Sequence, residues 1–255
     1  MIYIILAIVV IGAVLILYML KEGLDNRVIK KELVFPNFPD SFEKIKIFFI
    51  SDIHKREVTE ELLSQITEKV DLVIIGGDLL EKGVPLLRVK ENISKLKQLG
   101  PVYFVWGNND YEVDYRELDA TLLDLGVKIL DNTAVSFESL SGERFILLGT
   151  DDLKQERDRL DLALQDSGDE GFKVLVSHDP EIVKKIKKED NISLVLSGHT
   201  HGGQIRFLGY GLYEKGSYKK MDHTSILISN GYGTTTVPFR LGAKSETHVL
   251  TLKKG

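Results

Sequence analysis

The sequence predicts an α/β fold, in which βαβ units feed two packed sheets with helices on the outside. Three observations predict it. Short apolar runs bounded by glycine or polar residues are typical of buried parallel strands. Amphipathic stretches with helical spacing alternate with these runs. After residue 201, glycine, tyrosine and threonine become more frequent, and short strand-like segments joined by turns replace the alternation.

The first twenty residues are expected to form a membrane-spanning helix. Met1 to Leu20 contains no charged side chain, and at about 1.5 Å per residue it spans roughly the 30 Å hydrocarbon layer of a bilayer. It lacks the basic start and small-residue cleavage site of a signal peptide, and a buried core helix of this length usually carries some charge. Basic residues follow the helix and none precedes it. The positive-inside rule therefore predicts a single-pass protein of the cell membrane with a cytoplasmic catalytic domain.

Residues 21–43 are interpreted as a juxtamembrane linker, because they are charged and then contain prolines that cannot continue a helix. The remaining residues, 44–255, are expected to form one domain. Strands are expected at 47–50, 72–75, 102–106, 145–148, 172–177 and 192–197. Helices are expected at 58–69, 86–99, 117–125, 153–164 and 181–188. Antiparallel strands are expected at 204–208, 225–229 and 247–252.

The composition narrows the possible functions. The chain has 255 residues, 43% of them hydrophobic, which is enough to bury a sizeable core. It has no cysteine, which excludes disulfides and thiolate metal sites. The formal net charge of −5 argues against a nucleic-acid surface, so no nucleic-acid partner is expected.

Five of the apolar runs end in residue types that bind metals. Ligands in open α/β sheets gather beyond the carboxyl ends of the strands, so these side chains are expected to point at one place. Burying so many polar groups together without cations would be costly. The candidate metal ligands are Asp52, His54, Asp78, Asn108, His178, His199 and His201.

The chemistry of these ligands predicts a pair of transition metals. Imidazole, carboxylate and amide groups without thiolate suit Mn, Fe, Zn or Co, and are too rich in nitrogen for Ca. If the chain stays extended after the strand, Asp52 and His54 face the same side, and His199 and His201 repeat this spacing. Asp78 has two oxygens and is the natural bridge. Two ions about 3.5–4 Å apart would clamp a phosphate and deliver a hydroxide for in-line attack.

The motifs Asp52-Ile-His54, Gly77-Asp78, Gly107-Asn-Asn-Asp110, His178 and Gly198-His-Thr-His201 resemble those of the calcineurin-like metallophosphoesterases. The resemblance covers roughly residues 44–255 and implies a four-layer αββα sandwich with a two-metal centre. It also implies how the ions are held. One ion would be bound by Asp52, His54, Asp78 and His201. The other would be bound by Asp78, Asn108, His178 and His199.

The amino-terminal helix, Gly202-Gly-Gln204 and the segment from Gly231 to Gly242 resemble the bacterial membrane-anchored branch of that family. Members of that branch include phosphodiesterases, and at least one acts on a nucleotide-linked diacylglucosamine. The resemblance therefore implies that the substrate is a phosphorylated small molecule or a lipid-linked compound. Oligomeric state is left open.

Asn109 and Asp110 are the candidate catalytic residues, and here the sequence departs from the family pattern. The family often has a histidine at the position of Asn109, which donates a proton to the leaving group. Asparagine cannot act as an acid at neutral pH. Asp110, the usual partner of that histidine, is then left as a structural acceptor, and Asn109 as a hydrogen-bonding contact to a substrate oxygen. Poor leaving groups lose most without the acid, about 10²–10⁴-fold, which predicts preference for diesters or pyrophosphates over alkyl monoesters.

Arg240 is the second candidate for substrate binding, because its guanidinium could neutralise a phosphate with two hydrogen bonds. A surface salt bridge is the equally weighted alternative. The leading hypothesis is thus a membrane-tethered two-metal phosphodiesterase or pyrophosphatase. The alternatives are a catalytically silent scaffold on the same fold, a protein or monoester phosphatase, and a nuclease. Asn109 disfavours a monoester phosphatase, and the acidic balance disfavours a nuclease.

Overall fold

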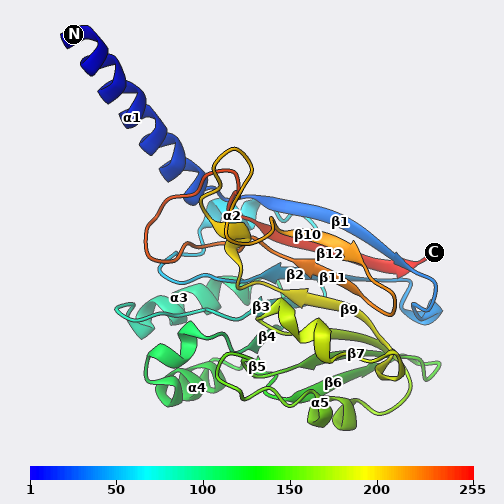
Figure 1. Ribbon diagram of the computed structural model, residues 1–255. Helices are drawn as coiled ribbons and strands as arrows, with labels where there is room; N and C mark the ends of the chain where they lie inside the picture. Colours follow the sequence, from blue (N-terminus) through cyan, green and yellow to red (C-terminus); the bar gives the residue numbers. More distant parts are fainter.

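The computed structural model describes residues 1–255, and two six-stranded sheets form its centre (Figure 1). In spatial order, the first sheet contains β1 (Val28–Phe35), β12 (Thr247–Lys254), β2 (Lys44–Ile50), β3 (Leu72–Gly76), β4 (Val102–Val105) and β5 (Lys128–Ile129). The second contains β10 (Ser217–Lys220), β11 (Ser225–Ile228), β9 (Ile192–Ser197), β8 (Phe172–Val176), β7 (Arg144–Gly149) and β6 (Thr133–Glu138).

The helices cover the outer faces of the two sheets. These helices are α2 (Glu60–Ser64), α3 (Leu86–Leu96), α4 (Tyr115–Asp124) and α5 (Leu160–Ser167), with a 3₁₀ helix η3 (Pro180–Lys185), whereas α1 (Ile2–Gly23) precedes the sandwich and covers neither sheet. Helices α2, α3 and α4 pack on the first sheet, and α5 and η3 on the second. The predicted four-layer αββα sandwich is therefore confirmed, with one apolar helix before it.

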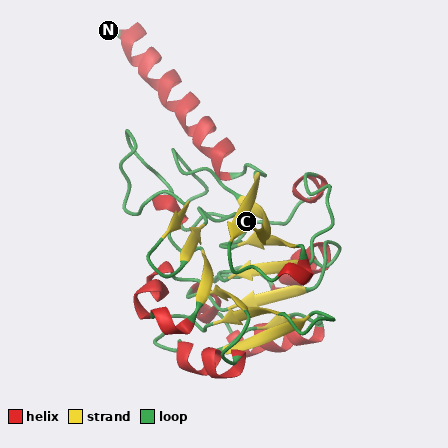
Figure 2. Cartoon of the chain, turned by 90° about the vertical axis from the view of Figure 1, so that its right-hand side faces the viewer, coloured by secondary structure: helices red, strands yellow, loops and turns green.

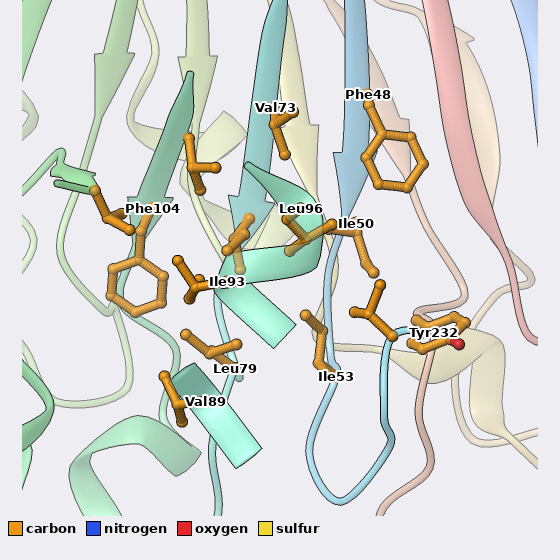
Figure 3. Close-up of a cluster of buried hydrophobic side chains, with 14 of the residues drawn as sticks. Phe48, Ile50, Ile53, Val73, Leu79, Val89, Ile93, Leu96, Phe104 and Tyr232 are labelled. Atoms are coloured by element: carbon orange, nitrogen blue, oxygen red, sulfur yellow. The ribbon is translucent and has the colours of Figure 1, made fainter. Parts of the chain in front are cut away.

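The alternation of side chains along buried strands builds three apolar layers. In β2, Phe48 and Ile50 point to the helices, where they belong to the same apolar cluster as Ile93 of α3 (Figure 3). Ile47 and Phe49 point the other way, into the layer between the two sheets. Because both faces are covered, the strand has to be apolar at successive positions. This is why the short apolar runs predicted the central strands correctly.

The direction of the strands decides where polar loops meet. β2, β3 and β4 are parallel to one another, as are β7, β8 and β9. Their carboxyl ends therefore lie at one edge of the sandwich, and the loops that follow them lie side by side. This edge carries the polar residues that the sequence singled out.

The segment predicted as a linker, residues 21–43, is instead part of the folded domain. Its residues 28–35 form β1, which pairs in parallel with β12 along its whole length. Leu33 and Phe35 of this strand are buried in the layer between the sheets. The charged residues of β1 lie mostly on its exposed face, so the strand lacks the continuous apolar run that identifies central strands. The boundary predicted at residue 44 is therefore wrong.

Two helices and one strand also differ from the sequence-based prediction. The helix expected at 58–69 is limited to α2, which begins at a Thr59 cap. The helix expected at 153–164 is displaced to α5, because the Asp151 carboxylate binds Arg157 and holds the preceding residues as a loop. Residues 204–208 form no strand, only isolated bridges. β11 is antiparallel to β10 but parallel to β9.

Helix α1 projects away from the sandwich, as Figures 1 and 2 show. It is long and apolar enough to cross a membrane by length and composition, and its apolar side chains are almost all exposed. Its carboxyl end is nevertheless fixed to the domain. Arg240 N–H donates to the Met19 carbonyl, and the buried Glu22 carboxylate accepts from Gly242 N–H. The helix therefore joins the sandwich through a specific contact.

Candidate metal centre

The seven candidate ligands come together at the carboxyl edge of the sheets. Asp52 and His54 follow β2, Asp78 follows β3 and Asn108 follows β4. His178 follows β8, while His199 and His201 follow β9. Side chains from both sheets thus meet across the sandwich, and six of them fall into two groups of three that could each hold a metal ion.

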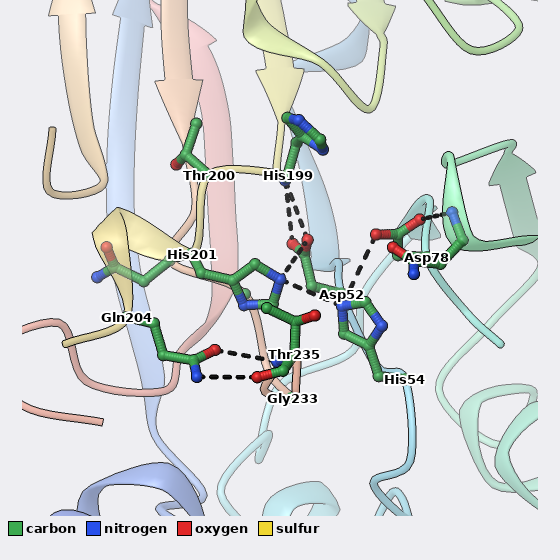
Figure 4. Close-up of polar contacts among 12 residues, drawn as sticks. Asp52, His54, Asp78, His199, Thr200, His201, Gln204, Gly233 and Thr235 are labelled. Carbon is green, nitrogen blue, oxygen red and sulfur yellow. Dashed lines mark hydrogen bonds and ion pairs between the residues drawn. The ribbon is translucent and has the colours of Figure 1, made fainter. Parts of the chain in front are cut away.

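The first group consists of Asp52, His54 and His201 (Figure 4). The Nε2 atoms of His54 and His201 lie 3.1 Å apart, and Asp52 Oδ1 lies 3.3 Å from His201 Nε2. Ligands bound at about 2.0–2.2 Å to one ion lie roughly 3–3.5 Å from one another in octahedral or tetrahedral arrangements. The spacing of these three atoms therefore fits a shared cation.

The second group consists of Asp78, His178 and His199. Asp78 Oδ2 lies 3.2 Å from His178 Nε2, and His178 Nε2 lies 3.2 Å from His199 Nδ1. The same Asp78 oxygen lies 3.7 Å from His54 Nε2 of the first group. One carboxylate oxygen is thus close to a nitrogen of each group, which is the arrangement that a bridging ligand requires.

The hydrogen bonds of Asn108 indicate that its side-chain oxygen is the remaining ligand of the second group. Its Nδ2 donates to the side chain of Asn109 at 2.9 Å. Its buried Oδ1 has no hydrogen-bond partner in the protein. A buried carbonyl oxygen without a donor is costly unless something else satisfies it. A divalent cation beside Asp78 would supply the missing partner, so the residues present fit the metal pair that the ligand chemistry implies.

The ligand-bearing turns are not extended, which corrects the expected geometry. Five of the seven residues have left-handed backbone angles: Asp52 (φ 54°), His54 (53°), Asp78 (52°), His199 (70°) and His201 (49°). This conformation costs roughly 1–2 kcal/mol for a residue with a side chain, and such strain clusters at functional sites. The space between the turns that carry the ligands is tight as well, because a Cβ on Gly198 would collide with the Asp52 carboxylate.

Charge in the site is balanced between acids and histidines. Burial alone would raise the pKa of Asp52 and of Asp78, but the neighbouring histidines outweigh it and lower both. Burial disfavours the charged form of His178, yet Asp78 outweighs it and raises the pKa of this histidine to about 10. Burial lowers the pKa of His201 to about 3, against the attraction of Asp52. The two carboxylates thus make the site attractive to positive charge.

Two close contacts orient the histidines, and one of them involves a residue that the sequence analysis missed. His178 Nδ1 lies 2.7 Å from the Gly76 carbonyl, which leaves Nε2 facing Asp78. His54 Nδ1 lies 3.0 Å from the carboxylate of Glu81, so its Nε2 faces the centre. Carboxylates behind a ligating histidine fix its tautomer. The position of Glu81 three residues after Asp78 gave no sign of this role in the sequence.

In the structure, backbone N–H groups surround the Asp110 carboxylate. Its carboxylate is fully buried and accepts from the backbone N–H groups of Gly107, Asp78 and Leu80, each at 2.9 Å. Burial and the charge of Asp78 raise its pKa to about 7, against the effect of these N–H donors. With both oxygens occupied, Asp110 joins the turns after β3 and β4 and has no contact left for a substrate. Its place among the candidate catalytic residues is therefore corrected to a positioning one.

Asn109 lies at the rim of the centre. Its backbone N–H donates to Asp78 Oδ1 at 2.8 Å, and its half-buried side chain lines a cleft of about 300 Å³. The cleft opens directly over Asp78, His199 and His201. The cleft is also lined by Gln204 and by residues that the sequence analysis did not name, Lys154, Leu212, Tyr213 and Thr235.

Arg240 does not contact this cleft, so the prediction that it binds substrate is corrected. Its side chain is fully buried. Its nitrogens donate to the backbone carbonyls of Asn230, Gly231, Gly233, His201 and Ala243, and one lies 3.2 Å from His201 Nδ1. Both the predicted phosphate contact and the alternative surface salt bridge are thus replaced by a buried cation that holds the turn carrying His201.

The sequence of this chain is similar to a known protein family and to individual proteins. The sequence model of the calcineurin-like phosphoesterase family matches residues 45–203. The uncharacterized protein YpbG of Bacillus subtilis is 48% identical over 210 residues, which cover 82% of this chain and 81% of that protein. A transmembrane protein with metallophosphoesterase domain from Danio rerio is 30% identical over 96% of this chain, which spans only 62% of that relative.

Among solved structures, a 5′-nucleotidase precursor from Thermus thermophilus has a similar fold. The TM-score is 0.52 over 82% of this chain and 55% of that chain, at 12% sequence identity. At this level of identity the similarity concerns the fold alone. The two-sheet sandwich of this chain is therefore a fold that this solved structure shares.

Proposed function

The chain belongs to the calcineurin-like phosphoesterase family, and from this membership we propose that it hydrolyses phosphodiester or pyrophosphate bonds at a centre of two divalent metal ions. Metal-dependent phosphoester hydrolysis is what the family supports. The preference for diesters or pyrophosphates is our own addition. One observation carries the proposal most directly: a single Asp78 oxygen lies within 3.7 Å of a nitrogen in each group of histidines.

The residues that would hold the ions follow from the two groups. Asp52, His54 and His201 would hold one ion and His178, His199 and Asn108 the other, with Asp78 shared between them. We propose Mn, Fe, Zn or Co, because nitrogen and hard oxygen ligands are mixed. Bound there, the pair would neutralise charge on phosphoryl oxygens and lower the pKa of a water.

The residues around the cleft determine how a phosphate would sit. Lys154 lines the cleft and its charge acts on His199, so its ammonium can pair with a phosphoryl oxygen beside the second group. The Asn109 amide, which also lines the cleft, can donate a hydrogen bond to a second oxygen. Gln204 shapes the wall, because its amide binds the Thr235 backbone through both its nitrogen and its oxygen. These groups hold and orient the phosphorus centre.

The leaving group receives no proton from the position where the family often has an acid. Asn109 has no titratable proton, and the neighbouring Asp110 carboxylate is buried under three N–H groups. Leaving groups that are stable as anions, such as a phosphate or an activated alcohol, need no such proton. This supports activated diesters and pyrophosphates over alkyl monoesters.

The location of the reaction is also part of the proposal. We propose that α1 anchors the chain in the cell membrane as a single-pass helix, with the sandwich on the cytoplasmic side, because Lys21 lies in the last turn of α1 and Arg27 follows the helix. A transmembrane relative supports the anchor. A phosphorylated small molecule or a lipid- or nucleotide-linked compound fits as substrate, and the net charge of −5 disfavours nucleic acid.

The proposal is tested on the full-length protein in detergent, loaded with Mn, with bis(p-nitrophenyl) phosphate as substrate. Asp78→Asn keeps the volume of the side chain but removes its charge, so it should lower hydrolysis by more than about 10²-fold, the loss expected for a group that stabilises transition-state charge. Metal analysis of the Asp78→Asn variant should show fewer than two ions per chain. Asp124→Asn, on the exposed surface of α4, is the matched control. Full activity in Asp78→Asn would contradict the shared carboxylate.

A further inference from the structure

A loop between β9 and β10, residues 205–213, exposes a cluster of apolar side chains. Phe207, Leu208, Tyr210 and Leu212 are 73%, 82%, 84% and 92% exposed. Outside α1, no other stretch of nine residues carries as many exposed large hydrophobic side chains. A contiguous exposed apolar patch on a protein surface usually marks a contact with another molecule or with a membrane.

The loop has a defined backbone conformation. Phe207 and Tyr210 exchange two backbone hydrogen bonds at 2.9 Å, which closes a tight turn with Leu208 and Gly209 at its tip. Both tip residues have left-handed backbone angles, φ 49° and 87°. Such turns favour asparagine or glycine at these positions, and leucine is uncommon there. The chain thus presents a large apolar side chain at a position where local folding does not favour one.

The interior of the loop is occupied by Arg206. Its guanidinium donates to the carbonyls of Gly202, Gly209 and Tyr213. Backbone carbonyls that would otherwise need water are therefore satisfied within the loop. Internal satisfaction of backbone groups is what entry into an apolar layer requires.

The loop is fixed to the end of α1 through backbone hydrogen bonds. The backbones of Arg206 and Gln204 bond to Leu241, and the N–H of the preceding residue, Arg240, donates to the Met19 carbonyl of α1. In Figure 1 the gold loop rises beside the lower end of α1, on the side toward which the helix projects. The tip lies about two residues beyond Arg206, or roughly 7 Å of extended chain. That reach is comparable to the 5–10 Å depth of the interfacial layer of a bilayer.

We propose that the 205–213 loop is a second membrane contact, which inserts Phe207 and Leu208 into the interfacial layer beside α1. This inference rests on the proposed anchoring of α1. The occupant is the bilayer because the loop rises beside the end of the apolar helix, on the side toward which the helix projects. Tyrosines such as Tyr210 favour this interface, and the loop contains no acidic residue. Since Leu212 and Tyr213 line the cleft, insertion would hold the mouth of the cleft against the membrane surface.

The chain has no cysteine, which permits a clean labelling experiment. Leu208→Cys carries an environment-sensitive fluorophore in full-length protein reconstituted into phosphatidylcholine–phosphatidylglycerol vesicles, some with nitroxide on the lipid chains near the headgroup. We expect blue-shifted emission and quenching by the nitroxide lipid. Leu140→Cys, a fully exposed position in the turn between β6 and β7, is the matched control and should show neither. Val10→Cys within α1 reports on the anchor.

Each outcome has a defined meaning. Quenching at both position 208 and position 10 supports the inference. Quenching at position 10 alone overturns it and leaves the anchor intact, whereas no quenching at position 10 removes the anchor and the inference together. A label at position 208 that is shielded without nitroxide quenching, and increasingly so at high protein-to-lipid ratio, would indicate a second copy of the chain and overturn the bilayer contact.

A second variant tests whether the apolar tip causes the insertion. With the label at Tyr210→Cys, the added double substitution Phe207→Ser and Leu208→Ser should abolish nitroxide quenching. Hydrolysis of the soluble diester bis(p-nitrophenyl) phosphate should stay unchanged, because neither tip residue lines the cleft. Quenching that persists in the double variant would contradict the role of these side chains.

Discussion

Asp78 is the residue on which the proposed chemistry depends most, because one of its oxygens lies close to histidines of both groups. Its other oxygen accepts from the Asn109 backbone N–H. This bond places the cleft-lining side chain of Asn109 next to the centre. At the scale of single residues, the seven candidate metal ligands therefore lie together, whereas Asn109 offers no acid that could protonate a leaving group.

The first residue-scale prediction concerns Asn109. Asn109→His should raise turnover of an alkyl monoester relative to bis(p-nitrophenyl) phosphate, because it restores an acid at the rim. We expect a gain near the lower end of the usual 10²–10⁴-fold range, since the Asp110 carboxylate is occupied by backbone N–H groups and cannot orient the new imidazole. The ratio of kcat/KM values measures the effect, with Asn109→Gln as control. An unchanged ratio would contradict the leaving-group argument.

The second residue-scale prediction concerns pH. The pKa of His178 is raised to about 10 by Asp78, so the metal-free site holds a proton there below that pH. A cation needs the neutral imidazole, and binding must release this proton. Metal affinity should therefore rise with pH up to about 10. Calorimetric titration with Mn in buffers of different ionisation enthalpy counts the protons released. Release of none near pH 7.5 would contradict the raised pKa.

At the scale of elements, the site is a set of strand-to-loop turns that buried polar residues hold together. Asp110 joins the turns after β3 and β4. Arg240 joins the turn after β9 to the loop after β11. Arg56, two residues after His54, stacks on Tyr232 and donates to the carbonyls of residues 23–25 at the end of α1. The turns that carry the ligands are thus fixed by residues that are not ligands.

Arg240 gives the element-scale prediction. Arg240→Lys keeps the charge but cannot reach five carbonyls with one ammonium. A buried cation that loses its partners costs about 3–5 kcal/mol, so we expect a loss of that size in the free energy of unfolding, measured by urea titration in detergent. Arg88→Lys, on the outer face of α3, is the control and should lose less than about 0.5 kcal/mol. Equal stability of the two variants would argue against the positioning role.

At the scale of the whole molecule, the apolar helix, the first strand and the cleft form one connected unit. β1 follows α1 after four residues and pairs with β12, the last strand of the chain. The end of α1 bonds to the loop between β11 and β12 that holds Arg240. Helix α1 is therefore coupled to the sandwich by sheet pairing and by buried polar contacts. This coupling fixes the direction in which the cleft faces relative to α1.

Leu33 provides the prediction for the molecule as a whole. Leu33→Asp places a charge in the layer between the sheets, where Leu33 is 3% exposed, and should lower the free energy of unfolding by about 2–5 kcal/mol. Val34→Asp, on the next residue of β1 and 43% exposed, should cost less than about 1 kcal/mol. Urea unfolding of the two variants in detergent measures the difference. Equal, small losses would mean that 21–43 is a linker after all.

The sequence predicted the central strands because burial on both faces forces a continuous apolar run, as in β3 and β8. It missed β1, whose exposed charged residues resemble a linker and whose partner strand lies at the other end of the chain. It also missed Glu81 and assigned Arg240 to substrate. Nothing in the sequence near Glu81 or Arg240 indicates that these side chains are buried. Neither role could therefore be assigned from the sequence pattern.

The sequence by itself determined which segments become buried strands and which seven residues stand at their ends, because periodicity and strand-end position are local properties. Only the tertiary structure decided which atoms meet. His54 and His201 are separated by 147 positions yet lie 3.1 Å apart. The shared Asp78 oxygen, the buried guanidinium of Arg240 and the apolar loop beside α1 all depend on how distant segments pack. Packing between distant segments leaves no periodic signal along the chain.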